Sequence, residues 1–181
     1  LWIGIAGVFF AVAYSIAPFK FAYRGLGEFC VGFTFGPLIV CGAYLVQAHT
    51  LNPIVILASL PIGFLIANVL WINQYPDYEA DKEGNKRNGV VRLGKEKASK
   101  VYAALFFGAY ASLILLVIVS RNPFWLLPFI TITMVVRAFI VAKKHFDYLP
   151  KQIEANIRTI QTYQLTGLTM VIAALMTRLF V

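Results

Sequence analysis

Long apolar runs alternate with short polar breaks along this chain. The runs fall near residues 1–17, 29–47, 54–74, 101–120, 124–142 and 160–180. A helix of about 20 mostly apolar residues is long enough to cross the hydrocarbon core of a bilayer. The pattern therefore predicts an all-α integral membrane protein with six transmembrane helices.

The breaks between the runs contain residues that end helices. Pro18 follows the first run, and an Asn-Pro pair lies at Asn52-Pro53 and again at Asn122-Pro123. The longest break, at about 75–100, is charged and predicts a loop or cap region outside the membrane. We expect residues 1–181 to form a single transmembrane domain. Because the first run is at full strength from Leu1 and no initiator Met precedes it, we also expect an N-terminally truncated chain.

Composition excludes an ordinary soluble domain. Of the 181 residues, 60% are hydrophobic and 13% are charged, whereas soluble proteins have about 45–50% apolar and about 25% charged residues. Sixteen Lys and Arg against eight Asp and Glu give a net charge of +8. Most of these basic residues lie in the breaks between spans, so their placement indicates membrane topology and not nucleic-acid binding.

The distribution of the basic residues predicts which loops face the cytoplasm. Thirteen of the sixteen lie in the breaks at 18–28, 75–100 and 143–159. Cytoplasmic loops of membrane proteins carry an excess of Lys and Arg. We therefore expect a multi-pass protein of the cell membrane, in contact with its lipids, with these three loops in the cytoplasm. The sequence leaves the oligomeric state open.

Two patterns inside the spans predict helix packing. Gly32 and Gly36 form a Gly-xxx-Gly pair, which lets another helix approach closely. Asn68 and Arg137 are polar at membrane depth, where such groups normally face the interior of the bundle. We expect them to make hydrogen bonds between helices or to contact a substrate.

Acidic residues concentrate at the end of the third run. Asp77 and Asp81 are separated by one helical turn, and Asn73 precedes them by another. If the helix continued past Pro76, all three side chains would lie on one face. Two neighbouring carboxylates repel each other unless a cation lies between them. Such a pair suits Mg²⁺, which takes oxygen ligands and shares its shell with substrate phosphates.

The next segment supplies positive charge. Residues 84–94 alternate glycines with cations, among them Lys86 and Arg87. Basic side chains beside a metal stabilise a departing diphosphate, and glycines suit a loop that closes over it. The alternative is an acidic cluster that is solvated among the lipid headgroups and neutralised by its basic neighbours.

These residues resemble a motif of the UbiA superfamily of intramembrane prenyltransferases. Asn73, Asp77 and Asp81, followed by Gly84 and Lys86, match its second aspartate-rich motif, and Tyr14 and Lys20 are similar to a Tyr and a Lys of the family's fourth helix. The segments at 23–28 and 91–94 look like the branch that prenylates 1,4-dihydroxy-2-naphthoate for menaquinone.

The resemblance implies a bundle of nine helices around a central cavity, of which the six runs would be helices four to nine. The family's first aspartate-rich motif lies in the part that would be missing, so we expect the chain on its own to be inactive.

The resemblance also implies an activity and assigns roles to residues. The enzyme would transfer a polyprenyl group from its diphosphate to an aromatic acceptor. The assigned residues are Asp77 and Asp81 for catalysis and Mg²⁺ binding, and Asn73, Lys86, Arg87, Lys20, Tyr14 and Arg24 for substrate binding. Lys20, Lys86 and Arg87 would bind the diphosphate, Tyr14 would offer its π face to the allylic cation, and Arg24 would lie near the acceptor.

Two other functions compete with this interpretation. CDP-alcohol phosphotransferases also use an Asp-x-x-x-Asp pair on membrane helices, but their Asp-Gly-x-x-Ala-Arg element does not occur here. A transporter or a non-enzymatic membrane protein would use the acidic cluster as an ion site. Such a protein would place charges near the middle of the membrane, whereas here they gather at one end of the helices.

Overall fold

The computed structural model describes residues 1–180, which are mostly helical. The elements in order are α1 (Trp2–Ser15), the 3₁₀ turn η1 (Phe21–Tyr23), α2 (Gly27–Phe33), the π-helical η2 (Thr34–Leu38), α3 (Ile39–Ala48), α4 (Pro53–Asn73), α5 (Tyr78–Glu83), α6 (Gly89–Leu93), α7 (Lys95–Ser120), the 3₁₀ helix η3 (Pro123–Thr131), α8 (Ile132–Lys144) and α9 (Leu149–Phe180).

Every predicted apolar run is helical, and the all-α fold is confirmed. Four helical segments within residues 1–180 are long and apolar enough to cross a membrane, and they cover Gly27–Ala48, Pro53–Asn73, Lys95–Ser120 and Pro123–Lys144. The first helix, α1, has only 14 residues. The last, α9, has 32 residues and begins with a polar stretch, so it extends well before residue 160. The number of six spans remains a prediction.

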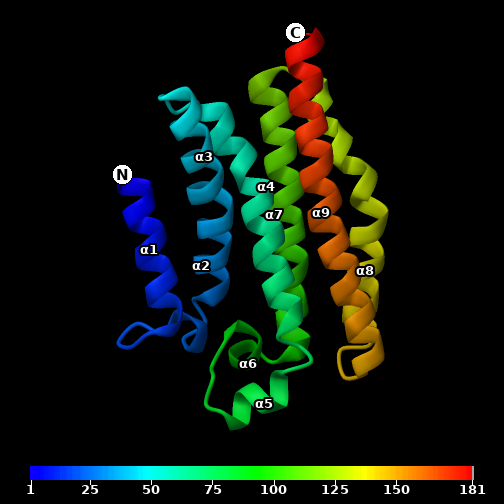
Figure 1. The fold of residues 1–181 in the computed structure, drawn as a ribbon. Helices are drawn as coiled ribbons and strands as arrows, with labels where there is room; N and C mark the ends of the chain where they lie inside the picture. The colour runs from blue at the N-terminus through cyan, green and yellow to red at the C-terminus, as the bar shows by residue number, and fades with distance from the viewer. Residues whose placement is uncertain (181) are drawn as a thin grey trace.

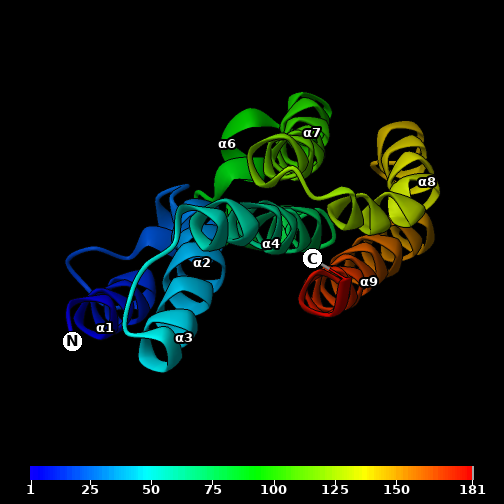
Figure 2. The ribbon, with the colours of Figure 1, turned by 90° about the horizontal axis from the view of Figure 1, so that it is seen from above.

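The long helices run side by side, with α4 near the middle of the bundle (Figures 1 and 2). α1, α2 and α3 lie on one side of α4, α8 and α9 lie on the other, and α7 packs along a third side of α4. The short helices α5 and α6 sit at one end, where the 15–27 connection and the α8–α9 turn also lie (Figure 1). The three basic breaks therefore share one end of the bundle.

The two Asn-Pro pairs begin helices at the opposite end. Asn52 accepts a hydrogen bond from the Ile54 N–H at 2.8 Å, and Asn122 accepts one from the Phe124 N–H at 3.0 Å. Each Asn caps its helix, and the proline that follows occupies a first-turn position where no N–H is needed. These pairs end one run and start the next, as their composition predicts.

The core lies between α4, α7, α8 and α9. Leu65, Tyr102 and Leu113 are fully buried in it. Asn68 is also fully buried and donates to the Tyr102 carbonyl at 3.1 Å, so its predicted role between helices is confirmed. Arg137 is exposed on α8, so the expectation that it faces the interior was wrong. The long Arg side chain lets the guanidinium reach away from an apolar helix surface.

Glycines bring α2 and η2 against α4, as the Gly-xxx-Gly pair predicts. A Cβ added to Gly36 would lie 2.6 Å from the Gly63 Cα, and one added to Gly32 would lie 2.9 Å from the Gly63 carbonyl oxygen. Real Cβ contacts essentially never come below 3.0 Å. Only glycine therefore permits this contact, which fixes the start of α2 beside the end of α4 where the acidic motif lies.

Candidate functional site at the basic end of the bundle

The helix formed by the third apolar run, α4, ends before the two aspartates. α4 stops at Asn73, and Pro76, which has no N–H, follows in a turn. The turn closes through shorter-range bonds, from the Gln74 N–H to the Trp71 carbonyl and from the Tyr75 N–H to the Ile72 carbonyl. The helix therefore does not continue through Pro76. Asn73 consequently does not share one helical face with Asp77 and Asp81.

The two aspartates keep the spacing of one helical turn. Asp77 stands immediately before α5, and its carbonyl accepts the Asp81 N–H at 2.7 Å. Asp77 is exposed, whereas the Asp81 side chain keeps only 13% of its surface accessible. The turn thus presents one open carboxylate beside one that the following loop partly covers.

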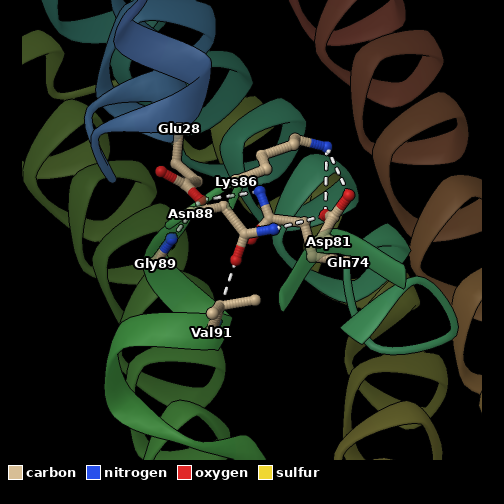
Figure 3. A network of polar contacts seen from close by, with 7 residues as sticks. All are labelled: Glu28, Gln74, Asp81, Lys86, Asn88, Gly89 and Val91. Carbon is tan, nitrogen blue, oxygen red and sulfur yellow. Dashed lines mark hydrogen bonds and ion pairs between the residues drawn. The ribbon is translucent and has the colours of Figure 1, made fainter. Parts of the chain in front are cut away.

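Asp81 is the centre of a polar network (Figure 3). The Lys86 ammonium lies 3.1 Å from Oδ1 and 3.0 Å from Oδ2, and Asn88 donates its amide to Oδ2 at 2.6 Å. The Lys86 N–H also donates to the Asp81 carbonyl at 2.8 Å. The loop after α5 therefore folds back over the aspartate, and a cationic group already sits across both carboxylate oxygens.

Asn88 was not identified from the sequence. It is 1% exposed, and its Oδ1 accepts the Val91 N–H at 2.9 Å, which caps α6. The signal was present, because an Asn followed by a short apolar stretch is a helix-start pattern. The same side chain holds Asp81 and begins α6, so the position of the carboxylate depends on the placement of that helix.

A buried tyrosine anchors the turn after α4. The Tyr75 hydroxyl donates to the Lys95 carbonyl at 3.0 Å, at the start of α7. Burial raises the pKa of the Tyr75 phenol, so the group stays a protonated donor. The segment at 75–100, expected as a loop or cap region, contains two short helices, and its last six residues belong to α7.

The first basic break contacts this cap. The Arg87 N–H donates to the Tyr23 carbonyl at 3.2 Å, and the Arg92 Nε donates to the Arg87 carbonyl at 2.8 Å. Gly25 has a φ of +74°, and an added Cβ would lie 2.8 Å from the Arg92 Cδ. Residues far apart in the sequence thus form one polar surface at this end of the bundle.

The remaining predicted site residues lie around this surface. The Tyr14 phenol is close enough to interact electrostatically with Lys86 and Glu28. The Lys20 ammonium lies 5.7 Å from the centre of the Tyr23 ring. Arg24 is exposed in the same break. The structure therefore brings Lys86 and Asp81 into contact, with Tyr14 within electrostatic range of Lys86. Lys20 and Arg24 are exposed at the rim of this surface.

Glu28 is a buried acid that the sequence analysis did not assign to the site. It lies in the first turn of α2 and is 6% exposed. Its Oε1 accepts the Gln74 amide at 2.7 Å and the Gly89 N–H at 3.3 Å. The available signal was an acid placed directly against an apolar run, but its partners are 46 and 61 residues away.

An apolar cavity of about 370 Å³ lies next to Glu28. Phe33, Phe64 and Trp71 are among the side chains from α2, α4 and α7 that line it. This volume falls within the range of small-molecule pockets, about 300–1,000 Å³. The cavity is able to hold an apolar chain or ring.

The acids of the site fit a magnesium ion only as part of a larger ligand set. Within residues 1–180, no group of three or more His, Cys, Asp or Glu side chains is arranged to hold a metal. The Lys86 ammonium across both oxygens of Asp81 nevertheless marks a place where a cation is held. Mg²⁺ is commonly bound by one or two carboxylates, with waters and substrate phosphates completing its shell. The pair Asp77 and Asp81 satisfies that smaller requirement.

The UbiA prenyltransferase family matches residues 1–176 of this chain. The 1,4-dihydroxy-2-naphthoate octaprenyltransferase of Escherichia coli (strain K12) is 36% identical over 125 residues, which are 69% of this chain and 41% of that protein. The UbiA prenyltransferase domain-containing protein 1 of Dictyostelium discoideum is 31% identical over 108 residues, or 60% of this chain and 33% of that protein.

A third relative has a related name. The 2-carboxy-1,4-naphthoquinone phytyltransferase of Synechocystis sp. (strain ATCC 27184 / PCC 6803 / Kazusa) is 33% identical over 99 residues, or 55% of this chain and 32% of that protein. The chain spans between about a third and two-fifths of the length of these relatives. No solved structure gave a significant match. With nearly its whole length matched by the family, this chain belongs to the UbiA prenyltransferase family.

Proposed function

We propose that this chain is part of a Mg²⁺-dependent intramembrane prenyltransferase that moves a polyprenyl group from its diphosphate to an aromatic acceptor. A 1,4-dihydroxy-2-naphthoate-like acid on the way to menaquinone is the proposed acceptor. Family membership supports the transfer reaction, and the names of the naphthoate-prenylating relatives support the acceptor class. The activity belongs to the full-length enzyme, because the chain spans well under half of those relatives.

The observation that carries this proposal is the fold of the cap over Asp81. Two carboxylates lie one helical turn apart, and the loop that follows returns Lys86 to within 3.1 Å of both oxygens of Asp81. Anionic and cationic groups thus occupy one small surface at the end of an apolar bundle. A substrate with a charged diphosphate head and an apolar tail needs both environments side by side.

Asp77 and Asp81 are the residues that would hold Mg²⁺, with waters and the diphosphate as the other ligands. The bound ion would supply Lewis-acid stabilisation of the charge that develops on the leaving diphosphate. Lys86 and Arg87 donate to the diphosphate oxygens, and Lys20 approaches from the first break. For Lys86 this requires a change of partner, from the Asp81 carboxylate to a phosphate oxygen. The exchange conserves its charge pairing.

The apolar surroundings of the site have a chemical purpose. Water near an allylic cation would capture it before the aromatic ring does. A cap that closes over the substrate, together with an apolar bundle, would keep water away. Tyr14, within electrostatic range of Lys86, would offer its π face to the allylic cation. Arg24, exposed in the first basic break, would pair with the carboxylate of the acceptor.

We further propose that the six helical segments are six spans, matching helices four to nine of a nine-helix bundle. The four segments that are long and apolar enough support this, together with the positions of α1 and α9 beside them. The basic breaks at one end favour that end as the cytoplasmic one. The proposed active site then faces the cytoplasm.

The proposal is tested by replacing each aspartate in the full-length enzyme in proteoliposomes. We expect Asp77→Asn and Asp81→Asn to lower turnover by at least about 100-fold, because an amide does not provide the charge that binds magnesium. Asp147→Asn is the matched control, since Asp147 is an exposed acid at the same end that pairs with Lys95. Wild-type turnover by either folded site variant would contradict the assignment.

The acceptor is tested by competition between substrates. The wild-type enzyme receives one prenyl diphosphate with dihydroxynaphthoate, 4-hydroxybenzoate, homogentisate or a glycerol phosphate, and kcat/KM is compared. We expect a preference for the naphthoate of about tenfold or more. A reversed preference would reject the menaquinone branch and leave the family intact. Ion transport without prenyl transfer would favour the competing transport function.

A further inference from the structure

Glu28 joins three segments of the chain at a single atom. It lies in the first turn of α2, Gln74 lies just after α4, and Gly89 is the first residue of α6. Both hydrogen bonds converge on Oε1, at 2.7 Å from the Gln74 amide and 3.3 Å from the Gly89 nitrogen. Figure 3 shows the carboxylate at the base of α2, pointing into the cap. One buried oxygen therefore ties the start of α2 and the end of α4 to the cap.

The residue beside Gly89 contacts the proposed metal ligand. Asn88 donates to the Asp81 Oδ2 at 2.6 Å, and its own Oδ1 accepts the Val91 N–H at 2.9 Å. Both side chains, Glu28 and Asn88, are more than nine-tenths buried. A continuous path of short contacts therefore runs from Glu28 through the Gly89 backbone and Asn88 to Asp81.

The packing around Gly89 leaves this segment few alternative positions. A Cβ at residue 89 would overlap the Trp71 indole, and it would lie 3.1 Å from the Glu28 Oε1. Trp71 is itself held by its Nε1–H, which donates to the Ala98 carbonyl at 3.0 Å. The Gly89 backbone thus packs against a ring that is held by its own hydrogen bond, and the Gly89 N–H donates to the Glu28 Oε1.

We propose that Glu28 is a positioning residue for Asp81, which it orients by fixing the Gly89 backbone and thereby Asn88. What is required of Glu28 is a hydrogen-bond acceptor at Oε1, not a negative charge and not a proton-transfer group. The inference rests on the proposed function for the role of Asp81. The hydrogen bonds through which Glu28 would orient Asp81 are nevertheless present without substrate.

The chemistry of the two donors distinguishes this role from acid–base catalysis. Because both donors use the same oxygen, a glutamine in place of Glu28 is able to present its amide oxygen to both. An alanine offers no acceptor and a methionine only a weakly accepting thioether, so two buried donors are then left without an oxygen partner. Glu28→Gln should therefore preserve the cap, whereas Glu28→Ala and Glu28→Met should loosen it.

The first measurement is hydrogen–deuterium exchange of the protein in detergent without substrate. We expect amides of residues 84–94 to exchange roughly tenfold or more faster in Glu28→Ala than in the wild type, and at close to the wild-type rate in Glu28→Gln. Glu28→Met keeps the length of the side chain and serves if the alanine variant does not fold. Asn122→Ala is the matched control, because it removes a buried capping side chain at the other end of the bundle.

The second measurement is the magnesium dependence of turnover in the full-length enzyme. We expect Glu28→Ala to raise the Mg²⁺ concentration for half-maximal rate by roughly tenfold. The double variant Glu28→Ala/Asn88→Ala should be no worse than Asn88→Ala alone, since the effect passes through Asn88. Glu28→Gln should keep the wild-type pH profile.

Each result decides the inference. Unchanged exchange in both Glu28→Ala and Glu28→Met would overturn it, and so would additive effects in the double variant. A glutamine variant as defective as alanine would show that the charge is needed and would reject the acceptor role. If the wild type transfers no prenyl group, the proposed function fails, while the exchange measurement still decides whether Glu28 holds the cap.

Discussion

Replacing Gly36 with alanine tests the contact that places α2 beside α4. The added Cβ would lie 2.6 Å from the Gly63 Cα, 2.8 Å from the Gly63 nitrogen and 2.8 Å from the Ser59 carbonyl oxygen. Ordinary van der Waals contact begins at 3.4 Å, so the new methyl group falls short by about 0.6–0.8 Å on three atoms. All three belong to the backbone of α4. No side-chain rotation relieves the overlap, and the helices must separate.

The expected cost follows from two opposing effects. Overpacking a close contact costs about 1–3 kcal/mol, and a contact between backbones lies at the upper end because neither side adjusts. Replacing glycine by alanine in a helix stabilises the folded state by up to about 1 kcal/mol, through helix propensity. We therefore expect Gly36→Ala to lower the free energy of unfolding by about 2 kcal/mol.

A second glycine provides the matched control. Gly4 lies in α1, and a Cβ there would meet no atom within 4 Å. Gly4→Ala should leave the free energy of unfolding unchanged or raise it by up to about 1 kcal/mol. The two variants carry the same chemical change in helices of the same bundle, so the difference between them, about 3 kcal/mol, isolates the overlap.

The assay is reversible unfolding in mixed micelles, followed by tryptophan fluorescence. Trp71 is buried on α4 and reports the packing of that helix. If Gly36→Ala unfolds within about 0.5 kcal/mol of Gly4→Ala, the helices are not in backbone contact and the argument fails. A lower free energy of unfolding in Gly36→Ala, but not in Gly4→Ala, would confirm that the two helical segments meet through their glycines.

Three further outcomes are expected. In membrane vesicles, a cysteine introduced at Glu83 should react from the cytoplasmic side and one at Thr50 from the opposite side; the reverse would invert the topology. Gly25→Ala should speed tryptic cleavage at the neighbouring Arg92, because φ is +74° and the Cβ would displace that side chain. Hydrogen bonds from Lys151 and Arg158 hold the pKa of Glu154 below its usual value. The ion pairs are therefore fully formed above the usual pKa and are lost as the pH falls through the lowered one. Amide hydrogen exchange at the start of α9 should then become faster at acidic pH.

Local patterns predicted much of this fold because hydropathy acts over one helix at a time. The six apolar runs each form helices, and the Asn-Pro pairs at residues 52 and 122 cap them. The Gly-xxx-Gly pair predicted a close helix contact, although its partner, Gly63, is not evident from the pattern. Helical periodicity indicates that a face is small, but not which helix will pack on it.

The end of α4 shows where local patterns are insufficient. The spacing of Asn73, Asp77 and Asp81 suits one helix, but Pro76 ends α4, and the turn is then stabilised by Tyr75 through a bond to α7. The periodicity alone does not show how the chain will close such a turn. Asp77 and Asp81 still share a helical turn because α5 starts anew after the break.

The buried parts of the site depend on contacts that are distant in sequence. Glu28 meets residues 46 and 61 positions away, and Asn88 reaches Asp81 only because the cap folds back. A carboxylate next to an apolar run looks the same in the sequence whether it lies in headgroups or in a buried network. Its low exposure, 6%, is set by α4 and α6 arriving on either side. Burying a charge without partners is costly, so the amide of Gln74 and the N–H of Gly89 explain why an acid is tolerated there at all, and why its removal should be felt at Asp81.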